Sequence, residues 1–358
     1  MRVLHLPHNV ASQVSVTVRA LRDIGVDARG VVLNNPDICS DSGIINYIRS
    51  GRRRHPVRGL FQTARWWCAV LRNILWADVV HWHCTSSTMY AELDLRAVKS
   101  LGRPRLVEFW GSDIRIPEIA SRDNPYIAQM YREHPELCNG CGAASLKSQE
   151  KFHRYGFACT VAGDELRNYL QQEYFPTPYR VRQRVLLEDY VARFPSPANR
   201  RPILVHCPSS KAKKGTEAVL KAVENLRGRH DFEFRLVHGV PRNQALAMMA
   251  ECDLYLDQFT IGAHGLAALE AMAFGKPVLC YIKPSLVGTY PTDMPIMNAN
   301  QDNLAQVLEP LLRDGTLRHD IGRRSRAYVE KYHDAHKLAR ELVGIYEELI
   351  EKQVRGRR

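Results

Sequence analysis

Residues 253–282 read DLYLDQFTIGAHGLAALEAMAFGKPVLCYI. The segments 254–256 and 278–282 are short apolar runs bounded by turn residues, which is typical of strands buried on both faces. Between them, residues 266–274 are strong helix formers, and Gly275 follows at the position where a left-handed residue commonly ends a helix. The stretch therefore predicts a strand, loop, helix and strand unit of a parallel α/β sheet.

The loop of this unit, Gly262-Ala263-His264-Gly265, falls between the carboxyl end of a strand and the start of a helix. Backbone N–H groups and the helix dipole favour an anion there, such as a diphosphate. Glu270 lies farther along the same helix, where its carboxylate is suited to bind a ribose diol beside the anion. A buried unit without a ligand is the alternative interpretation, because many folds contain this arrangement.

The run from Gly265 to Val278, GLAALEAMAFGKPV, resembles the donor-site signature of family 4 retaining glycosyltransferases. The resemblance implies the glycosyltransferase-B fold, an α/β fold with two Rossmann-like domains facing a cleft and a C-terminal helix that crosses back to the first domain. It also implies that Glu270 binds the donor ribose. The family usually carries a second Glu eight residues earlier, where this chain has Gly262, and this difference affects the sugar-contacting half of the motif.

A chain of 358 residues exceeds the size at which single hydrophobic cores stop growing, so two domains are expected. The first half alternates strands and helices, which predicts a parallel sheet covered on both faces. The Pro-rich passage 185–201 is typical of an interdomain connection. With the resemblance, we expect an acceptor-binding domain at 1–190, a donor-binding domain at 191–335, and a helix at 336–358 that packs back on the first domain.

Two strand ends in the first half, DVVHWH at 78–83 and FWGSDI at 109–114, resemble those that line the acceptor side in this family. A His commonly precedes the Gly-Ser-Asp of the second motif, but this chain has Trp110 there, and an indole cannot accept a proton. His83 and Asp113 are therefore the candidate catalytic residues. The alternative is that His81 and His83 are alternating strand residues, one buried and one exposed.

The second half opens with ILVHCPSSKAKKGTE at 203–217, which predicts a strand, a basic loop and a helix that begins near Thr216. By resemblance Lys214 contacts the donor diphosphate, Lys211 supplies a further charge, and the loop LVHGVPRN at 236–243 receives the base. The predicted donor-binding residues are Lys211, Lys214, Gly239, Val240, Arg242, Gly262, Ala263, His264, Gly265 and Glu270.

The chain carries a formal net charge of +12, and residues 49–76 concentrate arginines and aromatic residues. From Val57 onward the apolar positions fit one helix face with arginines on its flanks, the pattern of an interfacial helix at anionic lipid. The alternative is that Trp66 and Trp67 pack on the sheet and the arginines are solvated. No nucleic-acid reader motif accompanies the charge, so nucleic acid is not an expected partner.

Nine cysteines without regular spacing favour a reducing compartment, and the sequence predicts neither an export signal nor a spanning helix. We therefore expect a cytoplasmic protein, peripheral on the inner face of the cell membrane. Cys138 and Cys141, with His134 or His153, have the spacing of part of a zinc site. A reduced structural turn is the favoured interpretation of this isolated pair, and no metal site is predicted.

The resemblance implies a retaining, metal-independent glycosyltransferase of the hexosyl type, which moves a sugar from a nucleotide-sugar to a glycan or lipid-linked acceptor in bacterial surface polysaccharide or glycoconjugate synthesis. The nucleotide-sugar is a co-substrate, and no cofactor is expected. Two other functions stay open. A sugar-nucleotide 2-epimerase shares the fold, although Gly262 and Trp110 remove acid/base groups at the sugar. A catalytically silent sugar-nucleotide-binding subunit fits the same two differences.

Overall fold

The computed structural model describes residues 1–33, 44–46, 56–84, 87–138 and 141–355. The chain divides into two compact units that are each assembled from segments far apart in sequence. Unit 1 consists of Met1–Ile116, Gly140–Arg184 and Ala335–Arg358. Unit 2 consists of Pro117–Asn139 and Val185–Asp334.

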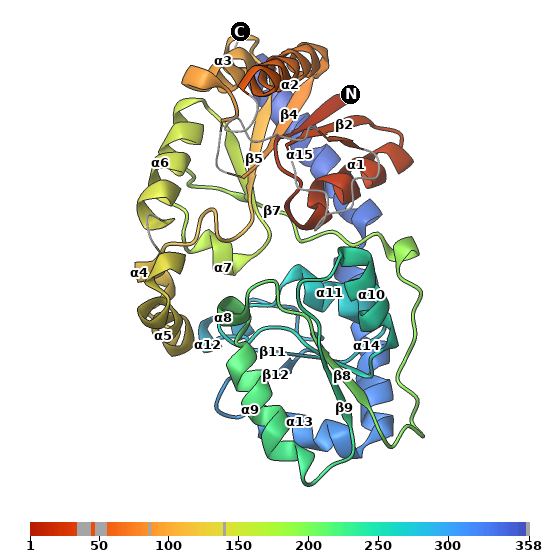
Figure 1. Ribbon diagram of the computed structural model, residues 1–358. Coiled ribbons are helices and arrows are strands. Elements are labelled where there is room, and N and C mark those ends of the chain that lie inside the picture. The colour runs from red at the N-terminus through yellow and green to blue at the C-terminus, as the bar shows by residue number, and fades with distance from the viewer. Residues whose placement is uncertain (34–43, 47–55, 85–86, 139–140, 356–358) are drawn as a thin grey trace. The chain divides into compact units, whose positions relative to one another are not determined.

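Within the described residues, unit 1 contains a seven-stranded sheet in which all neighbouring strands are parallel (Figure 1). Its spatial order is β3 (Ile44–Asn46), β2 (Asp27–Val32), β1 (Arg2–Leu6), β4 (Val79–His83), β5 (Arg105–Phe109), β6 (Ala158–Val161) and β7 (Tyr179–Arg180). Every residue of β4 is buried, which confirms the expectation of central strands covered on both faces.

The helices of unit 1 include one from the far end of the chain. In sequence order they are η1 (Val10–Ser12), α1 (Gln13–Asp23), α2 (Pro56–Trp76), η3 (Tyr90–Glu92), α3 (Leu93–Ser100), α6 (Cys141–Arg154), α7 (Asp164–Arg167) and α15 (Ala335–Arg355). The C-terminal α15 packs against α1 (Figure 1) and buries Leu338, Leu342 and Tyr346. The expected return of the C-terminal helix to the N-terminal unit is therefore observed.

Unit 2 contains a second parallel sheet, five-stranded within the part of the chain that the structure describes. Its order is β12 (Met297–Asn298), β11 (Val278–Cys280), β10 (Leu254–Leu256), β8 (Ile203–His206) and β9 (Glu233–Leu236). Alternate strand residues enter two different cores, with Tyr255 in one and Leu254 and Leu256 in the other. The short apolar runs at 254–256 and 278–280 are thus strands buried on both faces, as predicted.

Helices and short turns surround this sheet. They are α4 (Pro117–Ala120), α5 (Pro125–Glu133), η4 (Pro135–Leu137), η5 (Leu187–Asp189), α8 (Lys211–Lys214), α9 (Thr216–Arg227), α10 (Arg242–Glu251), α11 (Leu266–Ala273), α12 (Pro284–Val287), α13 (Leu304–Arg313) and α14 (Gly315–Tyr332). Gly275, two residues after α11, has a φ of +78°. This is the left-handed conformation expected where this helix ends.

Two segments lie differently from a simple two-domain division of the sequence. Residues 117–139, which the sequence predicts to be part of the first domain, belong to unit 2, where α5 packs near α8. The Pro-rich passage packs along unit 2 as well: the Arg193 N–H donates to the Phe274 carbonyl, and His319 contacts the Pro195 carbonyl. Among the described residues, no helix has the length and apolar character needed to cross a membrane.

Candidate functional site

The end of β10 and the start of α11 are joined through one buried carboxylate. Asp257, directly after β10, accepts a hydrogen bond of 2.9 Å from the Gly265 N–H and contacts the Lys214 ammonium at 2.6 Å. Burial alone would raise the pKa of Asp257, but Lys214 and the Gly265 N–H outweigh it and hold that pKa below its usual value. Asp257 therefore stays ionised and fixes both groups at the helix start.

Gly265 leaves the space that Lys214 needs. A Cβ at residue 265 would lie 3.1 Å from Lys214 Nζ and about as close to Asp257, at 3.5 Å. Gly265 precedes α11, whose first N–H groups have no carbonyl partner within the helix. The sequence prediction thus named two groups, Lys214 and the helix start, that the structure brings together into one candidate anion site.

Glu270 is at the centre of a second group of polar contacts in unit 2. Its Oε1 accepts hydrogen bonds from the Tyr190 hydroxyl at 3.0 Å and from Arg242 Nη2 at 2.5 Å. Burial raises the pKa of Glu270, and Arg242 opposes that shift. Glu270 and Arg242, both predicted donor-binding residues, are therefore in direct contact.

The loop from β9 to α10 positions Arg242. Gly239 in this loop has a φ of +73°, and His238 Nδ1 lies 2.8 Å from the Pro208 carbonyl oxygen, which ties the loop to the segment after β8. Gly239 is exposed and Val240 is half-buried, so both are accessible positions beside Arg242 at the first turn of α10.

Gly262, where the resembling family has Glu, is constrained by its neighbours. Its φ is +85°, and a Cβ there would lie 2.9 Å from Asn124 Nδ2 and 3.1 Å from Lys283 Cβ. The Asn124 amide donates to the carbonyls of Thr260 and Ile261 at 2.8 and 2.9 Å. Asn124 thus fills the space beside this turn, and a longer residue at 262 would displace it.

Three other predicted donor-binding residues differ in their contacts and exposure. The Ala263 carbonyl accepts a hydrogen bond from the Gln258 amide, and Ala263 is buried. His264 is partly buried, burial lowers its pKa, and its ring lies near that of Tyr290. Lys211 begins the one-turn helix α8 and its side chain is exposed, one turn before Lys214.

The two candidate catalytic residues lie in unit 1 and are both held by internal contacts. His83 ends β4, is fully buried, and its Nε2 lies 2.9 Å from His5 Nδ1. The Asp113 carboxylate accepts hydrogen bonds from the backbone N–H groups of Trp110 and Gly111 at 3.0 and 2.6 Å, which fixes its own turn. Burial raises the pKa of Asp113.

The alternative interpretation of the strand histidines, with one buried and one exposed, is wrong. His81 and His83 are two residues apart in a strand, so both side chains point to the same face of the sheet. Both are fully buried, together with His5. Burial lowers the pKa of His5 to about 3 and lowers the pKa of the other two well below the usual value.

The predicted zinc alternative at Cys138 and Cys141 lies partly outside the described residues, which exclude 139–140 and the Cys141 side chain. The two histidines offered as its further ligands make other contacts. His134 Nδ1 lies 3.3 Å from Glu136 Oε1, and His153 Nδ1 lies 3.1 Å from the Tyr174 carbonyl oxygen.

Sequence reasoning missed three residues of the unit 2 site. Asp257 carried a signal, because it is a carboxylate at the carboxyl end of a predicted buried strand, where functional groups gather in parallel sheets. Tyr190 and Asn124 carried none, since each lies far from its contacts in sequence, at 80 residues from Glu270 and 136 from Thr260.

The whole chain superimposes on solved structures of known fold. It matches sucrose-phosphate synthase from Thermosynechococcus elongatus with a TM-score of 0.67 and 13% identity, over 98% of this chain and 100% of that chain. Anabaena HepE in complex with UDP-glucose matches with a TM-score of 0.60 and 11% identity, over 97% and 100%. WaaG, a glycosyltransferase involved in lipopolysaccharide biosynthesis, matches with 0.58 and 14%, over 97% and 99%.

The chain has the glycosyltransferase-B fold. Two parallel sheets, each with helices around it, agree with these matches, and the coverage extends over nearly the entire length of both partners. The sequence matches no family model and has no significant match among curated proteins. At 11% to 14% identity the structural matches establish the fold, and the activity rests on the chemistry of the site.

Proposed function

We propose that this protein is a glycosyltransferase that uses a nucleotide-sugar donor bound by unit 2. The observation that carries the proposal is the joining of Lys214 to the start of α11 through Asp257. An ammonium group and backbone N–H groups at one helix start form a site for the diphosphate of such a donor. Support comes from HepE, a protein of the same fold solved with UDP-glucose.

Glu270 is the proposed ribose ligand. Its carboxylate already contacts Arg242 and Tyr190 through Oε1, so the ribose hydroxyls would join an existing polar cluster. Gly239, Val240 and Arg242 would then receive the base. In this proposal the base, ribose and diphosphate would follow one another along one side of unit 2, from α10 to the start of α11.

The chemistry we propose is metal-independent transfer with retention of configuration. Loss of the nucleoside diphosphate leaves negative charge on the phosphate oxygens, which Lys214 and the α11 N–H groups stabilise without a divalent ion. Asp257 and Glu270 are each bound to a cationic side chain, so neither is placed as a nucleophile. Attack by the acceptor from the face that the leaving group vacates accounts for retention without a covalent intermediate.

The Lys214 assignment is tested with the nucleoside diphosphate and the matching nucleoside. Changing Lys214→Met should weaken diphosphate binding by roughly 10- to 150-fold, the range of a charged hydrogen bond, and should change nucleoside binding much less. Lys213→Met, on the same turn, is the control. Diphosphate binding by the unchanged protein that requires added divalent ion would contradict the metal-independent site.

Unit 1 is the proposed acceptor unit, with His83 and Asp113 as its candidate catalytic residues. Both are held by internal contacts, so each would act by shaping the loop at the end of its strand. The proposed acceptor is a glycan or lipid-linked molecule of surface polysaccharide synthesis at the inner face of the membrane. WaaG, which shares the fold, is described as involved in lipopolysaccharide biosynthesis.

The reaction class is tested by incubating the protein with a panel of nucleotide-sugars, with and without candidate acceptors. Release of free nucleoside diphosphate, increased by an acceptor, supports transfer. An altered sugar on an intact nucleotide would instead identify a sugar-nucleotide 2-epimerase. Tight binding without turnover would identify a catalytically silent subunit, and absence of binding to every nucleotide-sugar would contradict the proposal as a whole.

A further inference from the structure

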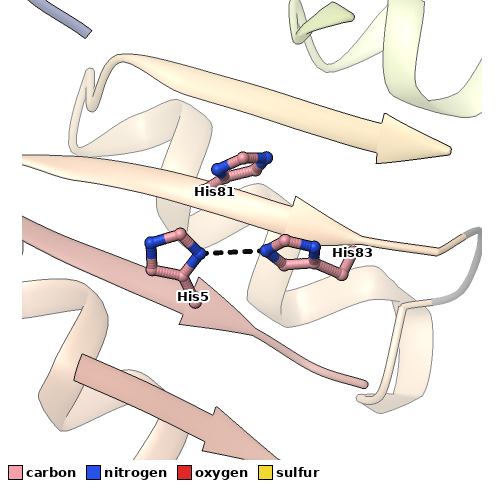
Figure 2. Close-up of side chains that lie close together, drawn as sticks. All are labelled: His5, His81 and His83. Carbon is pink, nitrogen blue, oxygen red and sulfur yellow. Dashed lines mark hydrogen bonds between the residues drawn. The ribbon is translucent and has the colours of Figure 1, made fainter. Parts of the chain in front are cut away.

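Three histidines of unit 1 converge on one face of its sheet (Figure 2). His5 lies on β1 and pairs in register with His81 on β4, and His83 follows two residues later on the same face. Glu108 on the next strand, β5, pairs in register with His83. All four side chains are fully buried, so the neighbouring strands β1, β4 and β5 together place three imidazoles and a carboxylate in the interior.

The rings are close enough to share one ion. His5 Nδ1 and His83 Nε2 are 2.9 Å apart, and each of the three rings offers a nitrogen within 4.8 Å of those of the other two. Two imidazole nitrogens bound tetrahedrally to one zinc ion at about 2.0–2.1 Å are separated by somewhat more than 3 Å, so only a small outward movement is needed.

The cluster leaves ring nitrogens unsatisfied. Among the described residues, His5 Nε2, His81 Nε2 and His83 Nδ1 are buried and have no hydrogen-bond partner. Glu108 Oε2 approaches His81 Nε2 and His83 Nδ1 at 3.4 Å each, beyond the ordinary hydrogen-bond distance. Buried polar atoms usually have partners, so the hydrogen bonds within the protein leave this cluster incompletely satisfied.

We propose that His5, His81 and His83 bind one divalent transition-metal ion of the zinc class, with Glu108 as the carboxylate that orients the ligating rings. Imidazole nitrogens suit such ions, and a carboxylate behind a ligating His is the usual second contact. The ion would use one ring nitrogen of each histidine, and these nitrogens lie within 4.8 Å of one another. Because the cluster is closed to solvent, the ion is structural and stabilises unit 1.

The charges around the cluster limit which ions fit. Arg184 is fully buried, and its Nη2 contacts both oxygens of Glu108 at 2.9 and 3.0 Å. A guanidinium near a divalent cation lowers the affinity for that cation, whereas Glu108 contributes compensating negative charge. The Tyr346 hydroxyl lies 2.7 Å from His81 Nδ1, so this ring nitrogen has a hydrogen-bond partner.

The first test uses the full chain, produced without a polyhistidine tag in medium containing zinc. Elemental analysis should find about one zinc per chain after gel filtration, and X-ray absorption should show coordination by several imidazole nitrogens. Cobalt substituted for zinc should give the visible absorption of a tetrahedral site. A folded wild-type chain without stoichiometric metal, or with metal bound mainly through sulfur, would overturn the proposal.

Variants locate the ion independently of that measurement. His5→Gln and His83→Gln should each remove most of the bound zinc, and removal of zinc should lower the unfolding temperature of the wild type but not that of these two variants. The matched control is His206→Gln, since His206 is a fully buried histidine of unit 2 with no place in the cluster. Zinc content that persists in the His5→Gln, His83→Gln double variant, or disappears in His206→Gln, would refute the assignment. If a cluster variant does not fold, the absorption spectrum of the wild type decides.

Discussion

At the scale of single residues, the two buried carboxylates of the unit 2 site differ in how well neighbouring groups stabilise their negative charge. Asp257 receives an ammonium and a backbone N–H, and its pKa is held below the usual value. Glu270 is also buried, and there burial outweighs Arg242 and raises the pKa. Asp257 is thus a fixed anchor for Lys214, whereas Glu270 is the group whose interactions a bound ribose would complete.

This difference predicts the effect of Glu270→Gln, which keeps the shape and removes the charge. Binding of a nucleoside diphosphate should weaken by about 1.5–3 kcal/mol, which corresponds to roughly 10- to 150-fold, because a charged hydrogen bond to the ribose is lost. Isothermal titration calorimetry measures the change. Glu251→Gln, an exposed position at the end of α10, is the control, and unchanged affinity in a folded Glu270→Gln protein would defeat the ribose assignment.

A second residue-scale prediction concerns His206, at the end of β8. Its ring is hydrogen-bonded to the Leu256 carbonyl and the Thr216 hydroxyl, and burial lowers its pKa to about 4. The unfolded chain therefore binds a proton near pH 6.5 that the folded chain binds only near pH 4. This group contributes stability above pH 6.5, and that contribution, up to about 3 kcal/mol, is lost as the pH falls toward 4.

Denaturant unfolding at several pH values measures this contribution. His206→Gln should show a smaller loss of unfolding free energy between pH 6.5 and 4 than the wild type, whatever its stability at pH 7. His134→Gln, which removes an exposed histidine, should follow the wild type. Equal slopes for wild type and His206→Gln would show that His206 does not remain neutral in the folded chain.

At the scale of elements, the predicted and observed helices and strands agree best where the residues that end each element lie in the same short stretch of sequence. The apolar runs, the helix formers and Gly275 define β10, α11 and β11 locally, so their type and approximate ends followed from residues 253–282 alone. The placement of α5 in unit 2 depends on Asn124, which caps α5 and binds the carbonyls of Thr260 and Ile261. No local pattern encodes such a contact.

The same limit applies to the histidines. The pattern of a single strand can place His81 and His83. His5 joins them only through the pairing of β1 with β4, since His5 and His83 are 78 residues apart in sequence. Gly262 could be recognised as a difference from the family, whereas its cause, the Asn124 amide beside the turn, required the folded chain. Candidate residues were thus predictable by type, and their contacts were not.

Helix α2 divides the predicted interfacial segment into two faces. Trp66, Val70 and Ile74 are buried in unit 1, and the Trp66 indole donates to Thr88, so packing accounts for one tryptophan. The other face exposes apolar residues with arginines beside them: Leu60, Phe61, Arg65, Leu71, Arg72 and Leu75. The arginines at 49 and 52–54 lie outside the described residues. The exposed face keeps the pattern of a helix that contacts anionic lipid.

This face predicts reversible binding to anionic vesicles that weakens as ionic strength rises. Arg65→Gln with Arg72→Gln should cost about 1 kcal/mol per arginine, and Phe61→Ser with Leu75→Ser should remove the apolar contribution. Co-sedimentation with anionic and neutral vesicles measures both. Leu220→Ser, an exposed leucine of α9, is the control. Equal pelleting with the two vesicle types, or none with either, would exclude the proposed contact.

At the scale of the whole molecule, segments of unit 1 and unit 2 alternate along the chain. Unit 1 closes only when α15, the last helix, packs against α1, the first long one. Unit 2 consists of Pro117–Asn139 and Val185–Asp334, so it contains no residue of α15. Folding of unit 1 therefore depends on a segment that follows all of unit 2, and the donor site proposed here does not include it.

Deleting residues 335–358 should consequently lower the stability of unit 1 and leave that of unit 2 largely unchanged. Unit 1 would lose the burial of Leu338, Leu342 and Tyr346, each of which contributes about 1.5–3 kcal/mol, an amount comparable with the stability of a whole domain. Limited proteolysis should then cleave within unit 1 first, while calorimetry still detects nucleoside diphosphate binding by unit 2. A chain ending at Arg355 retains the helix and is the control. Loss of diphosphate binding together with unit 1 would show that unit 2 does not hold the donor site by itself, and full protection of unit 1 would show that α15 is not needed to close its core.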